Sequence, residues 1–376
     1  MIPGPTNVPA RIINAMQKPM ISHRSAEYHE LHRSITEGAR YAFQTKGDIF
    51  ALTCSGTGGV ECAVSNVISP GDRVIIPVNG VFSQRFEENI ERFGGVPVEV
   101  PIEWGKAATP DQIKEAVKQE KNVKAIAVVY NETSTGATMR GLDEVGRIAE
   151  ERGLLFMVDA ISILCGDYLP VDSWKVDICI AGSQKCLACP PGVALISVSG
   201  KAWEAIEKGR RGSYYFDLHK ARESHAKDET PFTPSIPVFY ALDEALKMLR
   251  EEGLENRIKR HKVCAEAFYN ALQEMELQVL PDKQFRSNTV IAINIPRGIE
   301  DKAWRDLMRE KYGVMVAGGM GKLKGSIIRI GSMGVVSRVE VTATIKALGK
   351  SLTDLGQKVN LKAGLAAVEK VFTSSS

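Results

Sequence analysis

The amino-acid sequence predicts an α/β fold, in which a large domain with a mostly parallel seven-stranded sheet between helices precedes a smaller α+β domain. In the first half of the 376-residue chain, short and almost wholly apolar runs alternate with amphipathic helical patterns. Such runs are typical of strands buried on both faces, and their alternation with helices favours parallel pairing. The second half is first mainly helical and then mixed, which indicates a second core.

Seven apolar runs carry the sheet prediction. They are Ile49–Thr53, Arg73–Pro77, Val96–Val100, Ala125–Tyr130, Leu154–Asp159, Asp177–Ala181 and Val193–Val198. The helices between them are predicted at Gly59–Ile68, Phe82–Phe93, Asp111–Glu120 and Leu142–Arg152. Thr109-Pro110 is a usual start for the third helix, and Gly153 is a usual end for the fourth.

The rest of the chain predicts the smaller domain. A mainly helical stretch from Ser235 to about Met275 has Gly253 as its break. Strands are then predicted near Asn288–Ile295, Gly313–Ala317 and Ile327–Ile330, and helices near Glu300–Lys311 and Arg338–Leu355. We therefore expect an N-terminal segment at 1–14, a large domain at 15–252 and a small α+β domain at 253–376 whose tail is frayed at its end.

Composition argues against several classes of protein. Hydrophobic residues make up 44% of the chain and charged residues 25%, as in ordinary globular proteins. The net charge of +3 is too small and dispersed to favour nucleic acid, and no apolar run is long enough to span a membrane. The N-terminus lacks a signal-peptide pattern and the seven cysteines are scattered, so we expect a cytoplasmic protein. Cys186 and Cys189 form a lone C-x-x-C, interpreted as core residues, and no metal site is expected.

Two motifs follow predicted strands at positions where ligands bind. The segment Thr53–Gly59 opens a helix, and its small residues let the backbone close around a phosphate. Many such turns bind nothing. Asp159 ends an apolar strand at the edge where α/β sheets hold ligands, although an acid there more often caps a helix.

Two cations stand in apolar surroundings. Lys185 is flanked by small and apolar residues, and burial would lower its pKa and free the amine for attack. The gap between Asp159 and Lys185 fits one crossover and one strand, so both are expected at the same edge of the sheet. Arg329 lies inside an apolar strand and needs an anion, either a structural carboxylate or a ligand.

These parts together fit one cofactor chemistry. Amino-group transfer with pyridoxal 5′-phosphate (PLP) needs a lysine that forms a Schiff base and a carboxylate that keeps the pyridine nitrogen protonated. It also needs helix N-terminal amides for the phosphate and an arginine for the substrate carboxylate. The respective candidates are Lys185, Asp159, Thr57–Gly59 and Arg329.

At these motifs the chain resembles the class V, fold-type I PLP aminotransferases, in particular the group of alanine–glyoxylate and serine–pyruvate (or serine–glyoxylate) aminotransferases. The resemblance runs from Pro3 to about Leu355 and rests on Ser55–Gly59, Asn131–Gly136, Val158-Asp159, Gly182–Lys185, Pro190–Gly192 and Ile328–Gly331. It implies a PLP-binding large domain, an N-terminal segment near the active site, and a homodimer with active sites at the subunit interface.

The resemblance also implies a role for each site residue, with Lys185 and Asp159 as the catalytic pair. PLP binding is implied for Thr57, Gly58, Gly59 and Gln184 at the phosphate, Phe82 and Ile161 on the ring faces, and Thr133 at the ring hydroxyl. Phe82 stands where the family often has tryptophan. Substrate binding is implied for Arg329 and Gly4, and contact with the partner subunit's phosphate for Ser235.

The implied reaction is ping-pong transamination of serine or alanine with glyoxylate or pyruvate as acceptor. A 2-aminoethylphosphonate–pyruvate or an aspartate aminotransferase would share most of these motifs, and both stay open as alternatives. A cysteine desulfurase needs a nucleophilic loop cysteine in the C-terminal half, whereas the last cysteine, Cys264, lies in a helical pattern. The intact Lys185, Asp159 and Arg329 argue against a non-catalytic homologue.

Overall fold

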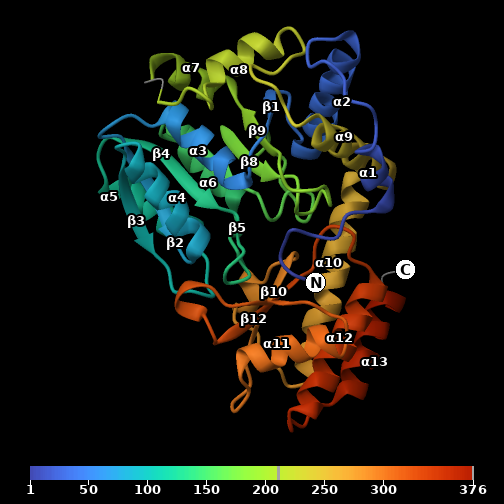
Figure 1. Cartoon of the computed structure of the whole chain (residues 1–376). Coiled ribbons are helices and arrows are strands. Elements are labelled where there is room, and N and C mark those ends of the chain that lie inside the picture. Colours follow the sequence, from blue (N-terminus) through green and yellow to red (C-terminus); the bar gives the residue numbers. More distant parts are fainter. Residues whose placement is uncertain (210–211, 375–376) are drawn as a thin grey trace.

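The computed structural model describes residues 1–209 and 212–374, and it has a large and a small part, each with its own sheet (Figure 1). The large sheet has the strand order β1-β9-β8-β7-β4-β2-β3. Its strands are β1 (Asp48–Leu52), β2 (Arg73–Val78), β3 (Val96–Pro101), β4 (Val123–Val129), β7 (Leu155–Asp159), β8 (Ile178–Gly182) and β9 (Ala194–Val198). Strand β9 pairs antiparallel with β1 and β8, whereas the other neighbours pair in parallel. The predicted mostly parallel seven-stranded sheet is therefore confirmed.

Helices cover both faces of this sheet. Because side chains alternate along a strand, β7 sends Phe156 and Val158 into one core and Leu155 and Met157 into the other. The first core includes α1 (Ala10–Ala15), α2 (Ala26–Phe43), α5 (Pro110–Gln119), α6 (Leu142–Glu151) and α9 (Ile236–Glu252). The second includes α3 (Gly56–Val67), α4 (Val81–Arg92), α7 (Gly200–Lys208) and α8 (Leu218–His225). All residues of β7 and β8 are buried, which explains why both sequences are apolar apart from Asp159 at the end of β7.

The small part packs around a separate core that contains Phe268, Ile291 and Trp304. Its antiparallel sheet has the order β10-β12-β11. Its elements are β10 (Val290–Asn294), β11 (Ala317–Gly318), β12 (Ile327–Gly331), α10 (Leu254–Glu274), α11 (Asp301–Glu310), α12 (Arg338–Asp354) and α13 (Leu361–Ser374). Helix α10 runs from the large part into the small part (Figure 1). Gly253, with φ of 82°, separates α9 from α10 at the predicted break.

Four short elements complete the described fold. They are the hairpin strands β5 (Asn131–Glu132) and β6 (Ala137–Thr138), and the 3-10 turns η1 (Lys283–Phe285) and η2 (Gly321–Leu323). Two predicted helix signals are confirmed: Thr109 caps α5 with Pro110 in its first turn, and Gly153 follows α6 with φ of 66°. Within the described ranges, no helix has the length and apolar content needed to cross a membrane.

Two predicted boundaries are wrong. Helix α3 begins at Gly56 rather than Gly59, because its first turn packs closely on the loop after β7: a Cβ at Gly56 would lie 2.7 Å from the Ile161 side chain. Residues 313–316 do not form a strand. Gly313, with φ of 67°, donates its N–H to the Arg309 carbonyl and ends α11 in a left-handed turn, so the strand is limited to Ala317–Gly318.

The C-terminal tail is more ordered than its weak pattern suggested. Residues 361–374 form α13, which packs against α10 and α12 and buries Val368 completely. Residues 375 and 376, part of the end expected to be frayed, lie outside the described residues.

Candidate active site

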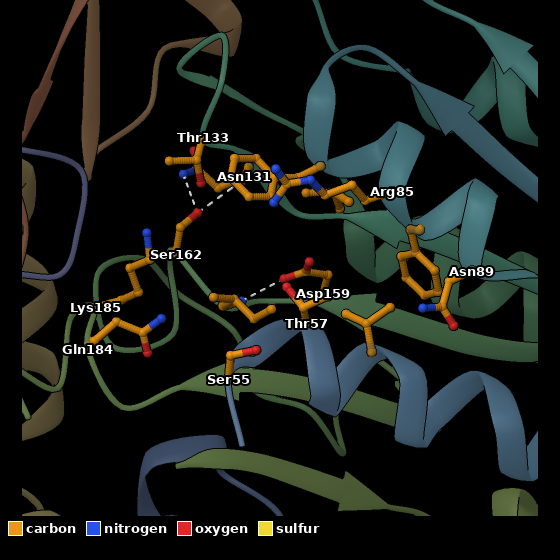
Figure 2. A pocket seen from close by; sticks show the side chains of 16 residues that line it. Ser55, Thr57, Arg85, Asn89, Asn131, Thr133, Asp159, Ser162, Gln184 and Lys185 are labelled. Carbon is orange, nitrogen blue, oxygen red and sulfur yellow. Dashed lines mark hydrogen bonds between the residues drawn. The ribbon is translucent and has the colours of Figure 1, made fainter. Parts of the chain in front are cut away.

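The carboxyl ends of two adjacent strands bring the two predicted catalytic residues together. Strands β7 and β8 pair in parallel, with Asp159 opposite Ile180. Asp159 therefore ends β7 at the edge of the sheet where the loop after β8 carries Lys185. Both side chains line one cavity of about 230 Å³ (Figure 2). Their predicted placement at one sheet edge is confirmed.

The same cavity collects several other predicted residues. Its lining also includes Thr57, Phe82, Thr133, Ile161 and Gln184. These come from the first turn of α3, the first turn of α4, the β5–β6 turn, and the loops after β7 and β8. Five predicted residues lie outside that lining, namely Gly4, Gly58, Gly59, Ser235 and Arg329. The cavity thus joins segments that lie far apart in the sequence.

Asp159 is a buried carboxylate with little compensation. Its side chain is 7% exposed, and Oδ1 accepts a hydrogen bond of 2.8 Å from the Ile161 N–H. Burial raises the pKa of Asp159 to about 7; the Ile161 hydrogen bond opposes this shift, and the charge of Glu132 adds to it. A carboxylate in this setting favours a cationic partner.

Lys185 lies at the cavity wall in a desolvated setting. Burial lowers the pKa of Lys185 to about 8, and the charge of Arg329 acts in the same direction. Its Nζ donates to the Pro3 carbonyl. A Cβ at Gly4, where φ is 99°, would lie 2.7 Å from Nζ, so this position needs glycine for both space and conformation. The N-terminal segment therefore contacts Lys185 directly.

The start of α3 is suited to an anion. The first N–H groups of a helix lack partners within it, and Ser55, the N-cap residue, supplies no side-chain cap. Gly58 and Gly59 serve close packing: their Cβ atoms would lie 2.8 Å from Cys54 and 2.7 Å from Ile180. In the described part of the chain, Oε1 of Gln184 is buried without a hydrogen-bond partner, although the residue lines the cavity. It is therefore available to a ligand.

Arg329 approaches the cavity from the small part. It lies in β12 and is 7% exposed. Its Nη1 donates to the Thr133 carbonyl at 3.0 Å, and its Nε donates to the Gly318 carbonyl at 2.9 Å. Burial lowers the pKa of Arg329 to about 10, opposed by the charge of Glu132. Both acceptors are carbonyls rather than carboxylates, so the guanidinium is held in place without being neutralised.

Five further polar residues line the cavity, and sequence reasoning gave none of them a role of its own. Ser55 and Asn131 lie within motifs already named, whereas Arg85, Asn89 and Ser162 were missed. Asn131 donates to Ser162 at 2.8 Å, and the Arg85 guanidinium lies 5.1 Å from the centre of the Phe82 ring. Arg85 follows Phe82 by about one helical turn, so the helical spacing could have indicated that both reach the same space.

Two remaining expectations concern Ser235 and the cysteines. Ser235 precedes α9 and donates its N–H to the Thr53 hydroxyl at 3.1 Å. Cys186 and Cys189 are buried free thiols, as the core interpretation predicted. Among the described residues, no group of three or more His, Cys, Asp or Glu side chains could hold a metal ion.

Comparison with known proteins places this site in a family. The chain matches the class V aminotransferases over residues 2–337. This chain belongs to the class V aminotransferases. Membership implies PLP-dependent amino-group transfer, and the predicted enzyme class and fold type are confirmed.

Relatives match along nearly the whole chain. An uncharacterized aminotransferase of Methanocaldococcus jannaschii is 41% identical over 374 residues, covering 99% of this chain and 97% of that protein. A chain named as the small subunit of a soluble hydrogenase in Synechococcus sp. is 36% identical over 379 residues, covering 100% and 98%. A serine–glyoxylate aminotransferase of Methylorubrum extorquens is 35% identical over 381 residues, covering 97% and 94%.

Solved structures agree with the sequence relatives. The ureidoglycine–glyoxylate aminotransferase of Bacillus subtilis superposes with a TM-score of 0.93 at 30% identity, covering 99% of this chain and 97% of that chain. The two-part architecture described above is therefore that of PLP aminotransferases of fold type I.

Proposed function

We propose that this class V aminotransferase transfers the amino group of serine or alanine to glyoxylate or pyruvate, with PLP bound in the cavity. The observation that carries the proposal is the convergence of Lys185 and Asp159, from adjacent parallel strands, on one cavity. The serine–glyoxylate activity in the name of one relative supports the substrate class.

The residues of the cavity fit PLP. The buried Asp159 carboxylate favours a cation, which a protonated pyridine nitrogen would supply. The start of α3, with the Thr57 hydroxyl, would bind the phosphate, and the unpartnered Gln184 oxygen or its amide would take a further polar group. Phe82 and Ile161 would cover the ring faces. Of these groups, Oε1 of Gln184 has no hydrogen-bond partner among the described residues.

Lys185, Asp159 and Arg329 would then contribute to the reaction in different ways. PLP supplies an aldehyde that condenses with amines and a ring that accepts electron density from the substrate α-carbon. With a pKa of about 8, about a quarter of Lys185 amines are unprotonated at pH 7.5, against about one in a thousand for an ordinary lysine. The neutral Lys185 amine would hold the aldehyde and, once the substrate amine has replaced it, would take the α-proton and give it back. Asp159 would hold the proton on the ring nitrogen, and Arg329 would bind the substrate carboxylate.

We further propose that the chain acts as a homodimer in which Ser235 contacts the partner subunit's phosphate site. Within one chain, Ser235 lies outside the cavity at the start of α9, which fits a contact made to another subunit. Size measurement by light scattering, together with PLP titration of Ser235→Ala, tests this. A monomer with full PLP affinity would overturn it.

Lysine replacement tests the core of the proposal. Lys185→Ala is expected to abolish the visible absorbance that appears when PLP is added to the protein, and to abolish transamination. Lys118→Ala, which changes an exposed lysine on α5, is the matched control. Full activity in Lys185→Ala would refute the assignment. Single-turnover spectra with serine, alanine, aspartate and aminoethylphosphonate then identify the donor.

One observation favours a second candidate class of donor. Arg85 adds a guanidinium to the cavity wall, beside the Phe82 ring. A second anionic group, such as the side-chain carboxylate of aspartate or a phosphonate, could pair with it. If Arg85→Gln weakens turnover of aspartate or aminoethylphosphonate but leaves that of serine unchanged, the second class is the correct one.

A further inference from the structure

Glu132 is a fully buried carboxylate outside the proposed catalytic pair. It is 0% exposed and lies in β5. Its oxygens accept hydrogen bonds from the backbone N–H groups of Phe82, Ser83 and Ser134 and from the hydroxyls of both serines. A buried charge without a cationic partner is tolerated when converging N–H and O–H groups solvate it. Here the donors belong to the first turn of α4 and to the β5–β6 turn.

Gly80 shows that space is reserved for this carboxylate. Its φ of 174° is extended backbone that any residue adopts, so its conformation does not require glycine. A Cβ at Gly80, however, would lie 2.4 Å from Cγ and Cδ of Glu132 and from Oγ of Ser134. The glycine is therefore needed because the Glu132 side chain occupies that space.

The two segments that Glu132 joins both carry site residues. The first turn of α4 carries Phe82, whose ring lines the cavity and whose N–H is one of the donors. The β5–β6 turn carries Thr133, which also lines the cavity. The Thr133 carbonyl in turn accepts from Arg329 at 3.0 Å. One carboxylate thus links the residue proposed to stack on the cofactor with the residue proposed to bind the substrate.

We infer that Glu132 is a positioning residue, which fixes the first turn of α4 against the Thr133 turn so that Phe82 and Arg329 keep the spacing that the reaction needs. This inference rests on the proposed function. Glu132 itself touches neither cofactor nor substrate in this role. Its charge also acts on its neighbours, since it counteracts the effect of burial on the pKa of Arg329.

Two substitutions test the hydrogen bonds between Glu132 and its donors in different ways. Glu132→Gln keeps the shape but presents an amide to N–H donors, whereas Gly80→Ala keeps the charge but displaces the carboxylate. The matched controls are Glu144→Gln, an exposed acid in the first turn of α6, and Gly200→Ala, a glycine in the first turn of α7 with no atom within 4 Å of the added Cβ. Ser134→Ala removes the Ser134 hydroxyl, which donates to Glu132 and accepts from the Val81 N–H, and keeps the other donors to Glu132.

The first measurement needs no cofactor. In the PLP-free protein, hydrogen exchange at the amides of Phe82, Ser83 and Ser134 is expected to accelerate by about tenfold or more in Glu132→Gln and Gly80→Ala, since hydrogen bonds to a charged group are the stronger ones. With PLP, the affinity for cofactor and the visible circular dichroism of the bound ring are expected to fall. The KM for the amino acid is expected to rise more than kcat falls, because Arg329 is displaced rather than removed.

The outcomes separate this inference from the proposed function. A wild-type protein that takes up no PLP refutes the proposed function. A wild-type protein that works, with exchange, PLP affinity and KM unchanged in Glu132→Gln and Gly80→Ala, refutes the positioning role alone. If Glu132→Gln does not fold, Gly80→Ala and Ser134→Ala decide, and wild-type values in both would overturn the inference.

Discussion

Replacement of Asp159 by asparagine is expected to stabilise the PLP-free protein while it impairs the reaction. The amide keeps the size of the side chain and an acceptor for the Ile161 N–H, but it has no charge for burial to desolvate. In the wild type, burial raises the pKa of Asp159 from 3.8 to about 7. Ionisation is therefore less favourable in the folded protein than in the unfolded chain.

The sign and size of the effect follow from linkage. Because the folded pKa lies above the unfolded one, the contribution of Asp159 to the free energy of unfolding is fully present below pH 3.8 and is lost as pH rises to about 7. The shift corresponds to a loss of about 4 kcal/mol at pH 8, of which about 2 kcal/mol occurs between pH 5.5 and pH 8. Asp159→Asn has no carboxyl to ionise and escapes this loss.

Urea unfolding of the PLP-free proteins at both pH values measures the difference. Asp159→Asn is expected to gain about 2 kcal/mol relative to wild type on going from pH 5.5 to pH 8. Asp143→Asn, at an exposed first-turn acid of α6, should gain nothing. Added PLP should stabilise the wild type more than Asp159→Asn, whose catalytic rate should fall severely. Identical pH slopes for wild type and Asp159→Asn would refute the view that Asp159 is ionised against a desolvation penalty.

Three other changes test separate parts of the structure. Arg329→Lys loses the planar guanidinium that can bind a carboxylate through two hydrogen bonds. The KM for the amino acid should therefore rise by about tenfold or more in steady-state assays, while PLP affinity stays within about twofold. An unchanged KM would contradict the carboxylate role. The rate at which the PLP-free wild type captures PLP should rise with pH and level off just above pH 8, because the neutral Lys185 amine is the reactive form. Stopped-flow absorbance measures this rate. A rise that continues to pH 10 would mean that the pKa of Lys185 is not lowered. Val368→Ala, in the buried face of α13, should lower the free energy of unfolding by about 1–3 kcal/mol in urea, whereas no loss would mean that α13 is not packed.

The elements best predicted from sequence are those whose burial is uniform. Apart from Asp159 at the end of β7, strands β7 and β8 are apolar because helices cover both faces of the sheet. Their positions could therefore be predicted to within a residue or two. Helices α1, α2, α7, α8 and α13 went unpredicted. In α2 the buried face includes His32 and Thr36, which interrupt the apolar period. In α13 the buried positions include Gly364, which packs against Met275 and has no side chain to mark the face.

The site was predictable where chemistry and strand position coincide. Asp159 and Lys185 each follow a recognisable strand, so their juxtaposition follows from parallel pairing. Glu132 lay within a motif, yet its donors on α4 are some 50 residues distant in sequence, and no local pattern relates them. Contacts that depend on how a helix and a distant turn pack together have no signature in a single sequence. The role proposed for Ser235 would depend on a second chain, so the structure around it within one chain gives even less local signal.

Burial shifts the pKa values of three ionisable groups of the site in the direction that favours the neutral form. Burial raises the pKa of Asp159 and lowers the pKa of Lys185 and of Arg329, so each is driven towards its neutral form. Such a site is costly in the folded protein unless ligands of opposite charge restore the missing partners. A cation beside Asp159 and an anion beside Arg329 would do so, whereas Lys185 is useful because its amine stays partly neutral. The same burial that makes ionised Asp159 costly would therefore favour a protonated ring beside it, and removing the charge should exchange function for stability.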